Sequence, residues 1–370
     1  MRVLVLANGG PNSAMGRRAQ ALFGDGGSHE VGICYREGAR WGEAVRLARE
    51  IRALRPQVVV LLDLAIHSFL AWLLAGGQRR AQLVSLTGDD MYAYHRLVRG
   101  RSEVICKAAR LLEDCAFRRS ELIGVRGTFH KQHLEERGYR NVRLLTDHVD
   151  LDVMRPVRAD ELRARLGLSG MFVAGAVGTL SWNPRWRLCY GWDLVEALPL
   201  VRQPSVRGLI VGGGDGLDQL RARAAELGVG DRLVFMGQVP PERVCSYINT
   251  MDVCLSTQTN NLVGRVRTTI KLPEYLACGR YVIATDVGEA SLVLPGIGSL
   301  LPYAPEVVRD DEYPARLAAE VDRLAGQPEL TRAVAERARQ VAEERFDLRK
   351  LRERAAAMLD ELAAGGVPRS

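Results

Sequence analysis

The sequence predicts an α/β protein with two doubly wound domains, each a parallel sheet covered by helices. Three observations point to this class. Short runs rich in β-branched residues alternate with longer stretches of helical periodicity, glycines follow several of these runs, and the alternation starts afresh near residue 171. A length of 370 residues also suits two domains of ordinary size better than one.

The first half of the chain carries short apolar runs that we interpret as strands. They are Val3–Ala7, Glu30–Tyr35, Val58–Leu62, Leu83–Leu86, Leu122–Val125 and Val142–Leu145. Apolar residues at helical spacing predict helices over Trp41–Leu54 and Val104–Arg119. After the last run, polar residues and Pro156 interrupt the alternation, so we place an N-terminal domain at residues 1–150.

The second half repeats this alternation. Its predicted strands lie in the segments MFVAGAVGTL, LIVGGG, LVFMG, VCLS, YVIAT and LLPY, the last at residues 300–303. From about Asp311 onward the sequence is helical and heavily charged. We expect a second domain at residues 151–345 and a terminal helix at residues 346–370 that packs back toward the first domain. Doubly wound sheets hold ligands at the carboxyl ends of their strands, so loops of both domains are expected to contribute to a site.

Composition narrows the classes of partner. Lys and Arg number 51 against 44 Asp and Glu, and the resulting charge of +7 suits an acidic ligand or an anionic membrane surface, or no specific partner at all. No nucleic-acid-binding module is recognisable, so we expect no nucleic acid partner. The seven cysteines are scattered without CxxC spacing, which indicates reduced thiols in a cytoplasm and no metal site.

The N-terminus and the longest apolar stretch bear on location. Arg2 leads straight into a predicted strand, so we expect no secretory signal. Spanning a bilayer takes ~20 apolar residues. The stretch at residues 58–77 approaches that length, but it contains Asp63 and His67 and divides into a strand and a short helix. We therefore predict a cytoplasmic protein without a spanning helix.

The most informative segment runs from Arg265 to Gly288 and reads RVRTTIKLPEYLACGRYVIATDVG. We expect a loop before it and a helix that begins near Thr269. A threonine at a helix start can cap free amides, and these amides with the helix dipole form an anion site. Arg265, Arg267 and Lys271 add three positive charges, which can hold a diphosphate and stabilise its departure.

Glu274 follows this basic loop within the same predicted helix. From there its carboxylate can accept two hydrogen bonds from vicinal hydroxyls such as those of a ribose. Gly279 is expected to end the helix. The alternative interpretation is a solvated basic loop followed by an ordinary surface glutamate.

This segment resembles the C-terminal hallmark of the family 4 retaining glycosyltransferases, whose usual form is E-x7-E followed by A-x-G-x-P-V-V-A. LTDHVDLDVMRP is similar to the family's hinge segment, and GLIVGGGDGLDQLRARAAELGVGDRLVFMGQVPPERV is similar to its stretch LLIVGDGPxxxxLxxLAxxLGLxDRVxFLGxVPxxEL. The three matches occur in the family's order, and the resemblance covers nearly the whole chain. It implies the GT-B fold, in which two Rossmann-like domains face each other across a central cleft.

The resemblance also implies a reaction. A hexose or amino-hexose would move from a nucleoside diphosphate sugar, UDP rather than GDP, to an acceptor hydroxyl with retention at the anomeric carbon. Neither a cofactor nor an obligatory metal is implied, since no DxD motif stands at a suitable strand end. Lys271, Arg267 and a helix terminus would stabilise the leaving group instead. The other donor residues that it implies are Glu274 at the ribose, Thr268 and Thr269 at the diphosphate, Gln238 and Val239 at the nucleobase, and Gly212 to Gly214 lining the donor pocket. Arg265 is expected at the diphosphate because of its charge.

One departure from the family pattern concerns the donor sugar. The first Glu of the family's pair would fall at position 266, where this chain has Val266. Some members carry a K-x-x-E-Y arrangement instead, which Lys271, Glu274 and Tyr275 reproduce. This departure affects the prediction of the donor sugar more than the prediction of the class of reaction.

A second departure concerns the diphosphate. The family's basic pair near the first strand of the second domain is replaced here by Thr179 and Tyr190. The inserted segment SWNPRWR supplies Arg185 and Arg187, which are expected to take over the diphosphate contact.

Two strand ends of the N-terminal domain carry candidate acceptor residues. GGPNSAMGRR is a glycine-rich turn into a helix, and the resemblance brings Gly9 and Gly10 near the phosphates or the acceptor. Asp89 and Asp90 follow another strand, where many family members have a His. A carboxylate there can take the acceptor's proton or bind its hydroxyls and amines. The alternative, weighted equally, is an aspartate that caps a helix.

Several further interpretations stay open. The stretch Arg96–Arg119 is rich in arginine and has an apolar face, which allows peripheral contact with an anionic membrane, as in relatives of the family, or forms a solvated helix face. A sugar-nucleotide epimerase of the same fold is an alternative function. A non-catalytic sugar-nucleotide-binding protein is another, which Val266 favours. The sequence identifies neither the acceptor nor an oligomeric state.

Overall fold

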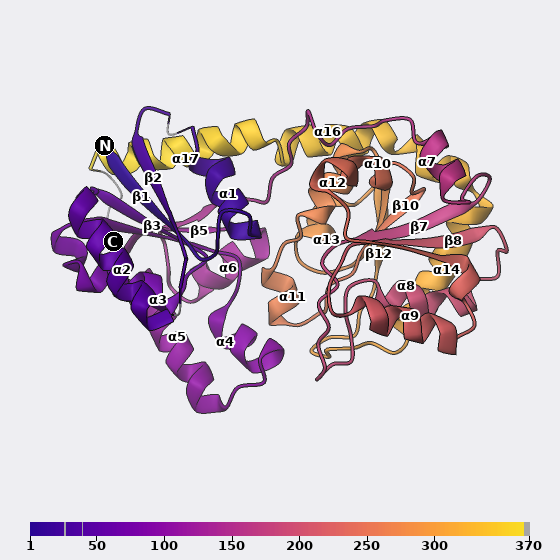
Figure 1. The fold of residues 1–370 in the computed structure, drawn as a ribbon, viewed down its shortest axis with the longest axis horizontal. Coiled ribbons are helices and arrows are strands. Elements are labelled where there is room, and N and C mark those ends of the chain that lie inside the picture. The colour runs from indigo at the N-terminus through magenta and orange to yellow at the C-terminus, as the bar shows by residue number, and fades with distance from the viewer. Residues whose placement is uncertain (26, 39, 366–370) are drawn as a thin grey trace. The chain divides into compact units, whose positions relative to one another are not determined.

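The chain forms two compact units, each an α/β structure around one parallel sheet (Figure 1), which confirms the predicted fold class. The computed structural model describes residues 1–25, 27–38 and 40–365. Unit 1 consists of Met1–Thr146, the short segment Val266–Thr268 and the C-terminal segment from Leu348. Unit 2 consists of Asp147–Arg265 and Thr269–Asp347.

The sheet of unit 1 has the order β2-β1-β3-β4-β5-β6, with every neighbouring pair parallel. Its strands are β1 (Arg2–Ala7), β2 (Glu30–Tyr35), β3 (Val58–Leu62), β4 (Gln82–Thr87), β5 (Ser120–Val125) and β6 (Val142–Leu144). All the strands predicted in this half are confirmed. The residues of β3 are buried on both faces of the sheet, as the continuous run VVVLL requires.

Helices cover both faces of this sheet. They are α1 (Ala14–Phe23), α2 (Arg40–Leu54), α3 (Ile66–Leu74), α4 (Met91–Ala93), α5 (Glu103–Phe117), α6 (Thr128–Glu136) and α17 (Leu348–Ala363). Successive strand residues point to opposite faces. Val58 and Val60 therefore pack with α1 and α17, whereas Val59 and Leu61 pack with α2 and α3. Figure 1 shows α17 beside α1, although the two are far apart in the sequence.

The sheet of unit 2 has the order β12-β11-β10-β7-β8-β9 and is also parallel throughout. Its strands are β7 (Phe172–Val177), β8 (Val206–Val211), β9 (Leu233–Gly237), β10 (Val253–Ser256), β11 (Tyr281–Thr285) and β12 (Gly298–Leu301). The prediction for β12, residues 300–303, was wrong by two positions. Pro302 has no backbone N–H to donate, so the strand ends before it.

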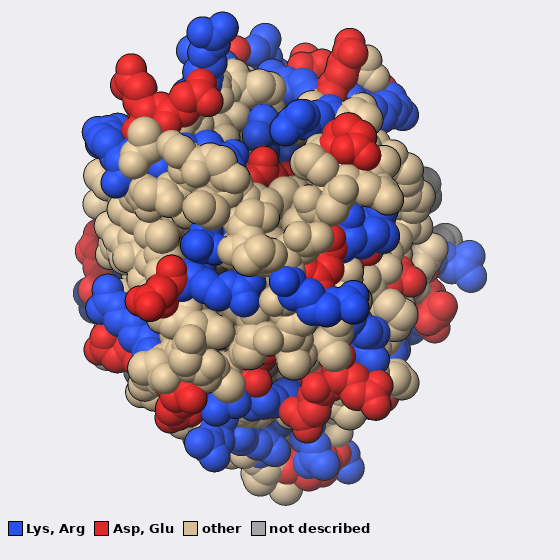
Figure 2. Space-filling view, turned by 90° about the vertical axis from the view of Figure 1, so that its right-hand side faces the viewer, with Lys and Arg blue, Asp and Glu red and all other residues tan. Residues whose placement is uncertain are grey.

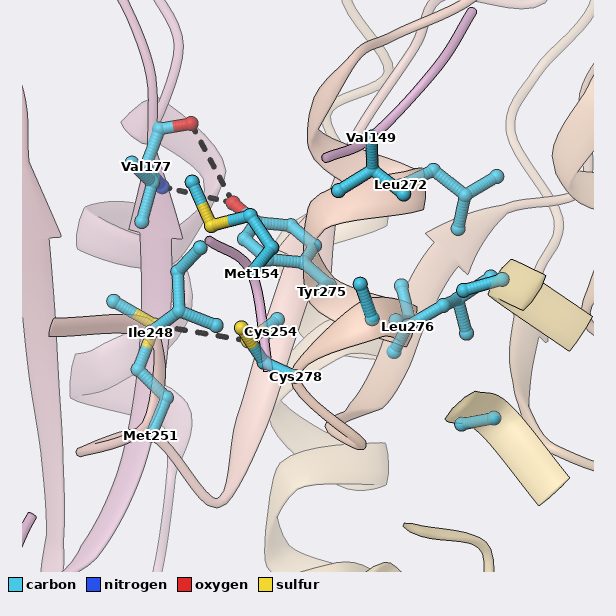
Figure 3. Packing of buried hydrophobic residues seen from close by; sticks show 14 of the residues in the cluster. Val149, Met154, Val177, Ile248, Met251, Cys254, Leu272, Tyr275, Leu276 and Cys278 are labelled. Atoms are coloured by element: carbon cyan, nitrogen blue, oxygen red, sulfur yellow. Dashed lines mark hydrogen bonds between the residues drawn. The ribbon is translucent and has the colours of Figure 1, made fainter. Parts of the chain in front are cut away.

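The helices of unit 2 also divide between the two faces of its sheet. They are α7 (Asp160–Arg165), α8 (Trp192–Ala197), α9 (Leu217–Glu226), α10 (Val244–Ile248), α11 (Leu262–Val266), α12 (Lys271–Ala277), α13 (Glu289–Val293), α14 (Tyr313–Gly326), α15 (Pro328–Ala333) and α16 (Ala335–Arg345). Helices α8, α9 and α14 pack on one face. Helices α10, α12, α13 and α16 pack on the other, where Figure 3 shows Tyr275, Leu276 and Cys278 among buried neighbours.

Two expectations around the key segment need correction. The expected loop before it contains the short helix α11, because the Asn261 side chain accepts a hydrogen bond from the Gly264 N–H at 3.2 Å and caps its first turn. Helix α12 begins at Lys271 rather than near Thr269. The predicted helix end is confirmed, since Gly279 follows α12 with a φ of +64°.

The charged stretch Arg96–Arg119 is not one continuous helix. A π-helical turn spans Tyr94–Val98, the chain turns at Gly100 with a φ of +59°, and α5 begins at Glu103. The apolar stretch at 58–77 divides into β3 and α3, as predicted. Among the described residues, no helix combines the length and the apolar character needed to cross a membrane.

Candidate functional site

In unit 2 the strand order reverses between β7 and β10, because β8 and β9 lie on one side of β7 and β10 to β12 on the other. Doubly wound sheets bind ligands at the carboxyl ends of the two strands that flank such a reversal. Two tyrosines complete the hydrogen bonding there. The Tyr275 hydroxyl accepts from the Val177 N–H at 2.9 Å, and the Tyr190 hydroxyl donates to the Leu255 carbonyl at 2.5 Å (Figure 3 shows Tyr275 and Val177). Since Tyr275 lies on α12, its hydroxyl fixes this helix at the end of β7.

Helix α12 carries the two residues on which the predicted donor site depends. The ammonium of Lys271 lies 2.8 Å from Oε2 of Glu274, and the two side chains are 21% and 12% exposed. The Lys271 N–H donates to the hydroxyl of Thr269 at 3.3 Å. A carboxylate has about four lone-pair sites, so Glu274 can accept further hydrogen bonds while it holds Lys271. The pair is oriented and partly accessible.

The three cations predicted to act together have three different partners. Lys271 pairs with its neighbour on α12, Arg265 pairs with Glu306 at 3.1 Å, and Arg267 pairs with Asp89. Arg267 and the adjacent Thr268 belong to the short segment grouped with unit 1. Each cation therefore has a carboxylate of its own, and their joint contact with a diphosphate stays a prediction.

Other residues predicted for the donor lie at neighbouring strand ends of unit 2. The Gly212 N–H donates to the Gly237 carbonyl at 2.9 Å, which brings the loop after β8 beside Gln238 and Val239. A Cβ at Gly214 would lie 2.3 Å from the Leu180 carbonyl oxygen, so close backbone approach requires glycine there. This packing accounts for the glycines structurally, and their contact with a donor stays a prediction.

The inserted segment forms a tight hairpin that the sequence did not predict. Asn183 and Leu188 form an isolated antiparallel bridge. The Asn183 side-chain oxygen accepts from the N–H groups of Arg185 and Trp186, at 3.1 and 3.2 Å. The turn presents Arg185 and Arg187 as exposed side chains, in a position to meet an anion. The Asn-Pro dipeptide was the signal for a turn.

In unit 1 the strand order reverses between β1 and β3. The turn after β1 contains Gly9 and Gly10, and Ser13 caps the helix that follows. The Ser13 hydroxyl accepts from the Gly16 N–H at 3.0 Å and donates to the Gly10 carbonyl at 2.7 Å. A Cβ at Gly9 would lie 2.4 Å from this hydroxyl, so the turn packs against its own capping residue.

Asp90 has the helix-capping role that the sequence left open. Its side chain is fully buried and accepts from the Ala93 N–H at 2.8 Å and from Arg110 at 2.8 and 2.9 Å. Burial alone would raise its pKa, but hydrogen bonds from His133 and Ala93 and the charge of Arg110 outweigh it and lower the pKa to about 2. An engaged, buried carboxylate cannot meet an acceptor, so Asp90 is no longer proposed as catalytic.

Asp89, in contrast, is partly accessible, with its side chain 35% exposed. Its backbone carbonyl accepts from the Thr87 hydroxyl at 3.0 Å, and its carboxylate pairs with Arg267. The guanidinium of Arg267 also lies 5.4 Å from the centre of the Tyr94 ring. Asp89 therefore keeps its place as a candidate, held by a cation that the sequence assigned to the donor.

A second ion pair at the carboxyl ends of the unit 1 strands was not predicted from the sequence. Asp63 follows β3 and Arg126 follows β5, and their charged groups lie 2.7 Å apart. Asp63 has a φ of +55°, which is uncommon for any residue other than glycine. The signal was present in the sequence, because Asp63 directly follows a buried strand. A charge that interrupts an apolar stretch does not by itself indicate a partner 63 positions away.

Two buried titratable groups lie close to Asp90. Glu113, from α5, accepts from the Met91 N–H at 3.0 Å and is 1% exposed. Burial raises its pKa to about 7, with the charge of Asp90 contributing in the same direction. His130, from α6, is also 1% exposed, and burial lowers its pKa to about 4. The two shifts affect stability in opposite directions.

We expect these groups to offset each other in the free energy of unfolding. Between pH 6.5 and 4 the unfolded chain protonates His130 and the folded chain does not, so stability falls as the pH falls. Between pH 4.5 and 7 the folded chain keeps Glu113 protonated, so stability falls as the pH rises. Each full effect is on the order of 3 kcal/mol. The pair therefore contributes a nearly flat profile where the two ranges overlap.

Single substitutions should reveal how each group changes the free energy of unfolding with pH. His130→Gln leaves the effect of Glu113, so the free energy of unfolding should decrease more steeply with rising pH than in the unaltered protein. Glu113→Gln should change the slope in the opposite sense. Urea unfolding at several pH values measures all three profiles. Parallel profiles for the three proteins would contradict the buried environment of both groups.

Comparison with known proteins bears on the family. Residues 172–327 match the family described as Glycosyl transferases group 1. The D-inositol 3-phosphate glycosyltransferase of Acidothermus cellulolyticus is 27% identical over 250 residues, 65% of this chain and 51% of that protein. The 2-deoxystreptamine glucosyltransferase of Streptomyces kanamyceticus is 27% identical over 198 residues, 51% of this chain and 46% of that protein. The chain spans about half the length of these curated relatives.

The solved structures define the fold. HepE of Anabaena, in complex with UDP-glucose, is similar with a TM-score of 0.76 and 17% identity, over 98% of this chain and 100% of that one. At this identity the likeness shows the fold alone. The two parallel-sheet units are the two Rossmann-like halves of the GT-B fold.

Proposed function

We propose that this protein, whose residues 172–327 match the family described as Glycosyl transferases group 1, is a retaining glycosyltransferase. It moves a hexose or amino-hexose from a nucleoside diphosphate sugar, UDP rather than GDP, to an acceptor hydroxyl. HepE, which has the same fold, was solved with UDP-glucose, and this favours a uridine donor. The names of two relatives give cyclitols as acceptors, D-inositol 3-phosphate and 2-deoxystreptamine, and this favours a cyclitol acceptor here.

The observation that carries the proposal is the Lys271–Glu274 pair beside the reversal of strand order in unit 2. Glu274 offers acceptor oxygens to a ribose diol. Lys271 offers a positive charge within one helical turn of it, where a departing diphosphate develops negative charge. Arg185 and Arg187, exposed on the hairpin, extend this positive charge. No cofactor or obligatory metal is part of the proposal.

Titration calorimetry with UDP and GDP, followed by transfer assays with radiolabelled UDP-glucose, tests this function. The expected result is binding of UDP and transfer that requires an acceptor and survives a metal chelator. Proton NMR of the product would show the retained anomeric configuration. Consumption of the donor without an acceptor would favour an epimerase. Binding without turnover across a broad panel of acceptors would favour a non-catalytic binding protein.

We also propose peripheral contact of α5 with an anionic membrane, within a cytoplasmic location that suits the free cysteines. Val104 and Leu111 are 77% and 68% exposed, and Ala108 between them completes a stripe at helical spacing. The exposed Lys107 and Arg101 flank it. On the face drawn in Figure 2, basic and acidic side chains are interspersed. An apolar stripe with basic flanks suits the interface of a bilayer with acidic headgroups.

Substitution of the stripe should abolish this contact. The double variant Val104→Ser, Leu111→Ser is expected to lose at least ~10-fold in binding to vesicles containing phosphatidylglycerol, measured by flotation. Leu200→Ser, on another exposed apolar residue, is the control and should bind as before. Equal binding by the double variant and the control would remove α5 from the contact.

A further inference from the structure

Two cysteines of unit 2 lie in contact beside the helix that carries the proposed donor residues. Cys245 is on α10, and Cys278 directly follows the last residue of α12. Their sulfurs are 3.9 Å apart, within hydrogen-bonding distance for two thiols. Both side chains belong to the hydrophobic cluster that Figure 3 shows around Cys278. The fold therefore brings together two thiols that are 33 positions apart in the sequence.

Cys245 is the more reactive of these two thiols. It is 7% exposed, whereas Cys278 is fully buried. When neutral, the Cys245 thiol donates to the Arg155 carbonyl at 3.3 Å. The hydrogen bond from the Cys278 thiol lowers the pKa of Cys245 to about 6, although burial opposes this shift. The side-chain amide of Asn249, 3.5 Å from the Cys245 sulfur, also donates to it. Since the thiolate is the form that attacks oxidants, the arrangement prepares Cys245 for this role.

Cys278 is also joined to Glu274 through the backbone. Its N–H donates to the Glu274 carbonyl at 3.1 Å, a hydrogen bond of the last turn of α12. A disulfide requires its two sulfurs to be bonded rather than in contact, so α10 and this last turn would have to move toward each other. The Tyr275 hydroxyl holds the same helix at the end of β7. Because the interior is close-packed, a shift of the last turn would displace the Glu274 carboxylate.

We propose that Cys245 and Cys278 are a site of reversible oxidation by hydroperoxides, and that the disulfide formed there weakens binding of the nucleotide donor. The Cys245 thiolate attacks a peroxide oxygen, the O–O bond breaks, and the sulfur becomes a sulfenic acid. The departing alkoxide or hydroxide takes up the proton that the thiol had lost. The Cys278 thiol then attacks the oxidised sulfur, and water leaves.

The overall reaction converts two thiols and one hydroperoxide into one disulfide, one alcohol and one water, with a second water in place of the alcohol for hydrogen peroxide. Each sulfur loses one electron, and the peroxide gains two. A thiol reductant reverses the step by exchange with the disulfide. The weaker donor binding rests on the proposed function, whereas the oxidation itself does not.

The test treats the reduced, full-length protein with hydrogen peroxide, alkylates the remaining thiols and maps its peptides by mass spectrometry without reductant. The expected product is a linked pair of peptides that contain Cys245 and Cys278. The Kd for UDP, measured by calorimetry, should rise ~10-fold or more on oxidation, because Glu274 loses its alignment with the ribose. Addition of dithiothreitol should restore both the original Kd and the rate of sugar transfer.

Cys245→Ala and Cys278→Ala should each bind UDP equally well before and after treatment with peroxide. Cys254→Ala is the matched control, because Cys254 is buried in the same cluster, with its sulfur 3.7 Å from that of Met251. This control should respond to peroxide as the unaltered protein does.

The outcomes separate the two proposals. Absence of UDP binding by the reduced protein would overturn the proposed function, and the peptide map would still test the oxidation. No disulfide, a disulfide through Cys254, or an unchanged Kd for UDP in the oxidised protein would overturn this inference alone.

Discussion

Glu274→Gln is expected to lower kcat/KM for sugar transfer by ~100-fold or more while the protein stays folded. The amide cannot accept charge-assisted hydrogen bonds from a ribose diol, and it leaves the ammonium of Lys271 without its carboxylate at 2.8 Å. Lys271→Ala should reduce kcat more than it changes donor affinity, because its charge is needed most as the diphosphate departs. Steady-state transfer assays with UDP binding by calorimetry separate the two effects.

Glu306→Gln is the matched control for this prediction. Glu306 pairs with Arg265 at 3.1 Å in the same unit, but its side chain is 66% exposed, and exposed ion pairs contribute ~0–1 kcal/mol. Its transfer rate and melting temperature should stay unchanged. Normal turnover in both the Glu274 and the Lys271 variants would remove the donor site from α12.

Gly212→Ala is expected to destabilise the protein by ~4 kcal/mol or more. The residue has a φ of +147°, which side-chain-bearing residues rarely adopt, and a Cβ there would lie 1.8 Å from the carbonyl oxygen of Gly178. That oxygen belongs to the backbone at the end of β7, so neither loop can move without disturbing the strands. Chemical denaturation followed by circular dichroism measures the loss.

Gly228→Ala separates the cost of steric overlap from the cost of backbone strain. Gly228 also has a positive φ, +66°, but no atom lies within 4 Å of the point that a Cβ would occupy there. Its substitution should cost only ~1 kcal/mol. Equal destabilisation by the two substitutions would show that the loops after β7 and β8 do not approach each other closely.

The sequence predicted the fold well because the features that determine it are local. A buried parallel strand needs a continuous apolar run, and VVVLL at β3 is visible without any knowledge of its neighbours. The helix α11 was missed because a single side chain, Asn261, caps it. The position of β12 was missed for an equally local reason, the Pro302 that ends it.

The site was predicted less completely because its contacts are distant in the sequence. Arg267 meets Asp89 across 178 positions, and Arg126 meets Asp63 across 63. Neither contact can be inferred from spacing or periodicity. Lys271 and Glu274 were predicted from their charges and from the K-x-x-E-Y arrangement, whereas the ion pair between them, three residues apart on one helix, was not predicted.

The membership of α17 in unit 1 has a practical consequence for dissecting the molecule. Its Leu351, Met358 and Leu359 cover the same sheet face as Leu22 and Phe23 of α1. A fragment ending at Thr146 would expose that apolar surface to water and would tend to aggregate. Chimeras that exchange unit 1 between relatives must therefore carry the last helix of the chain together with its first residues.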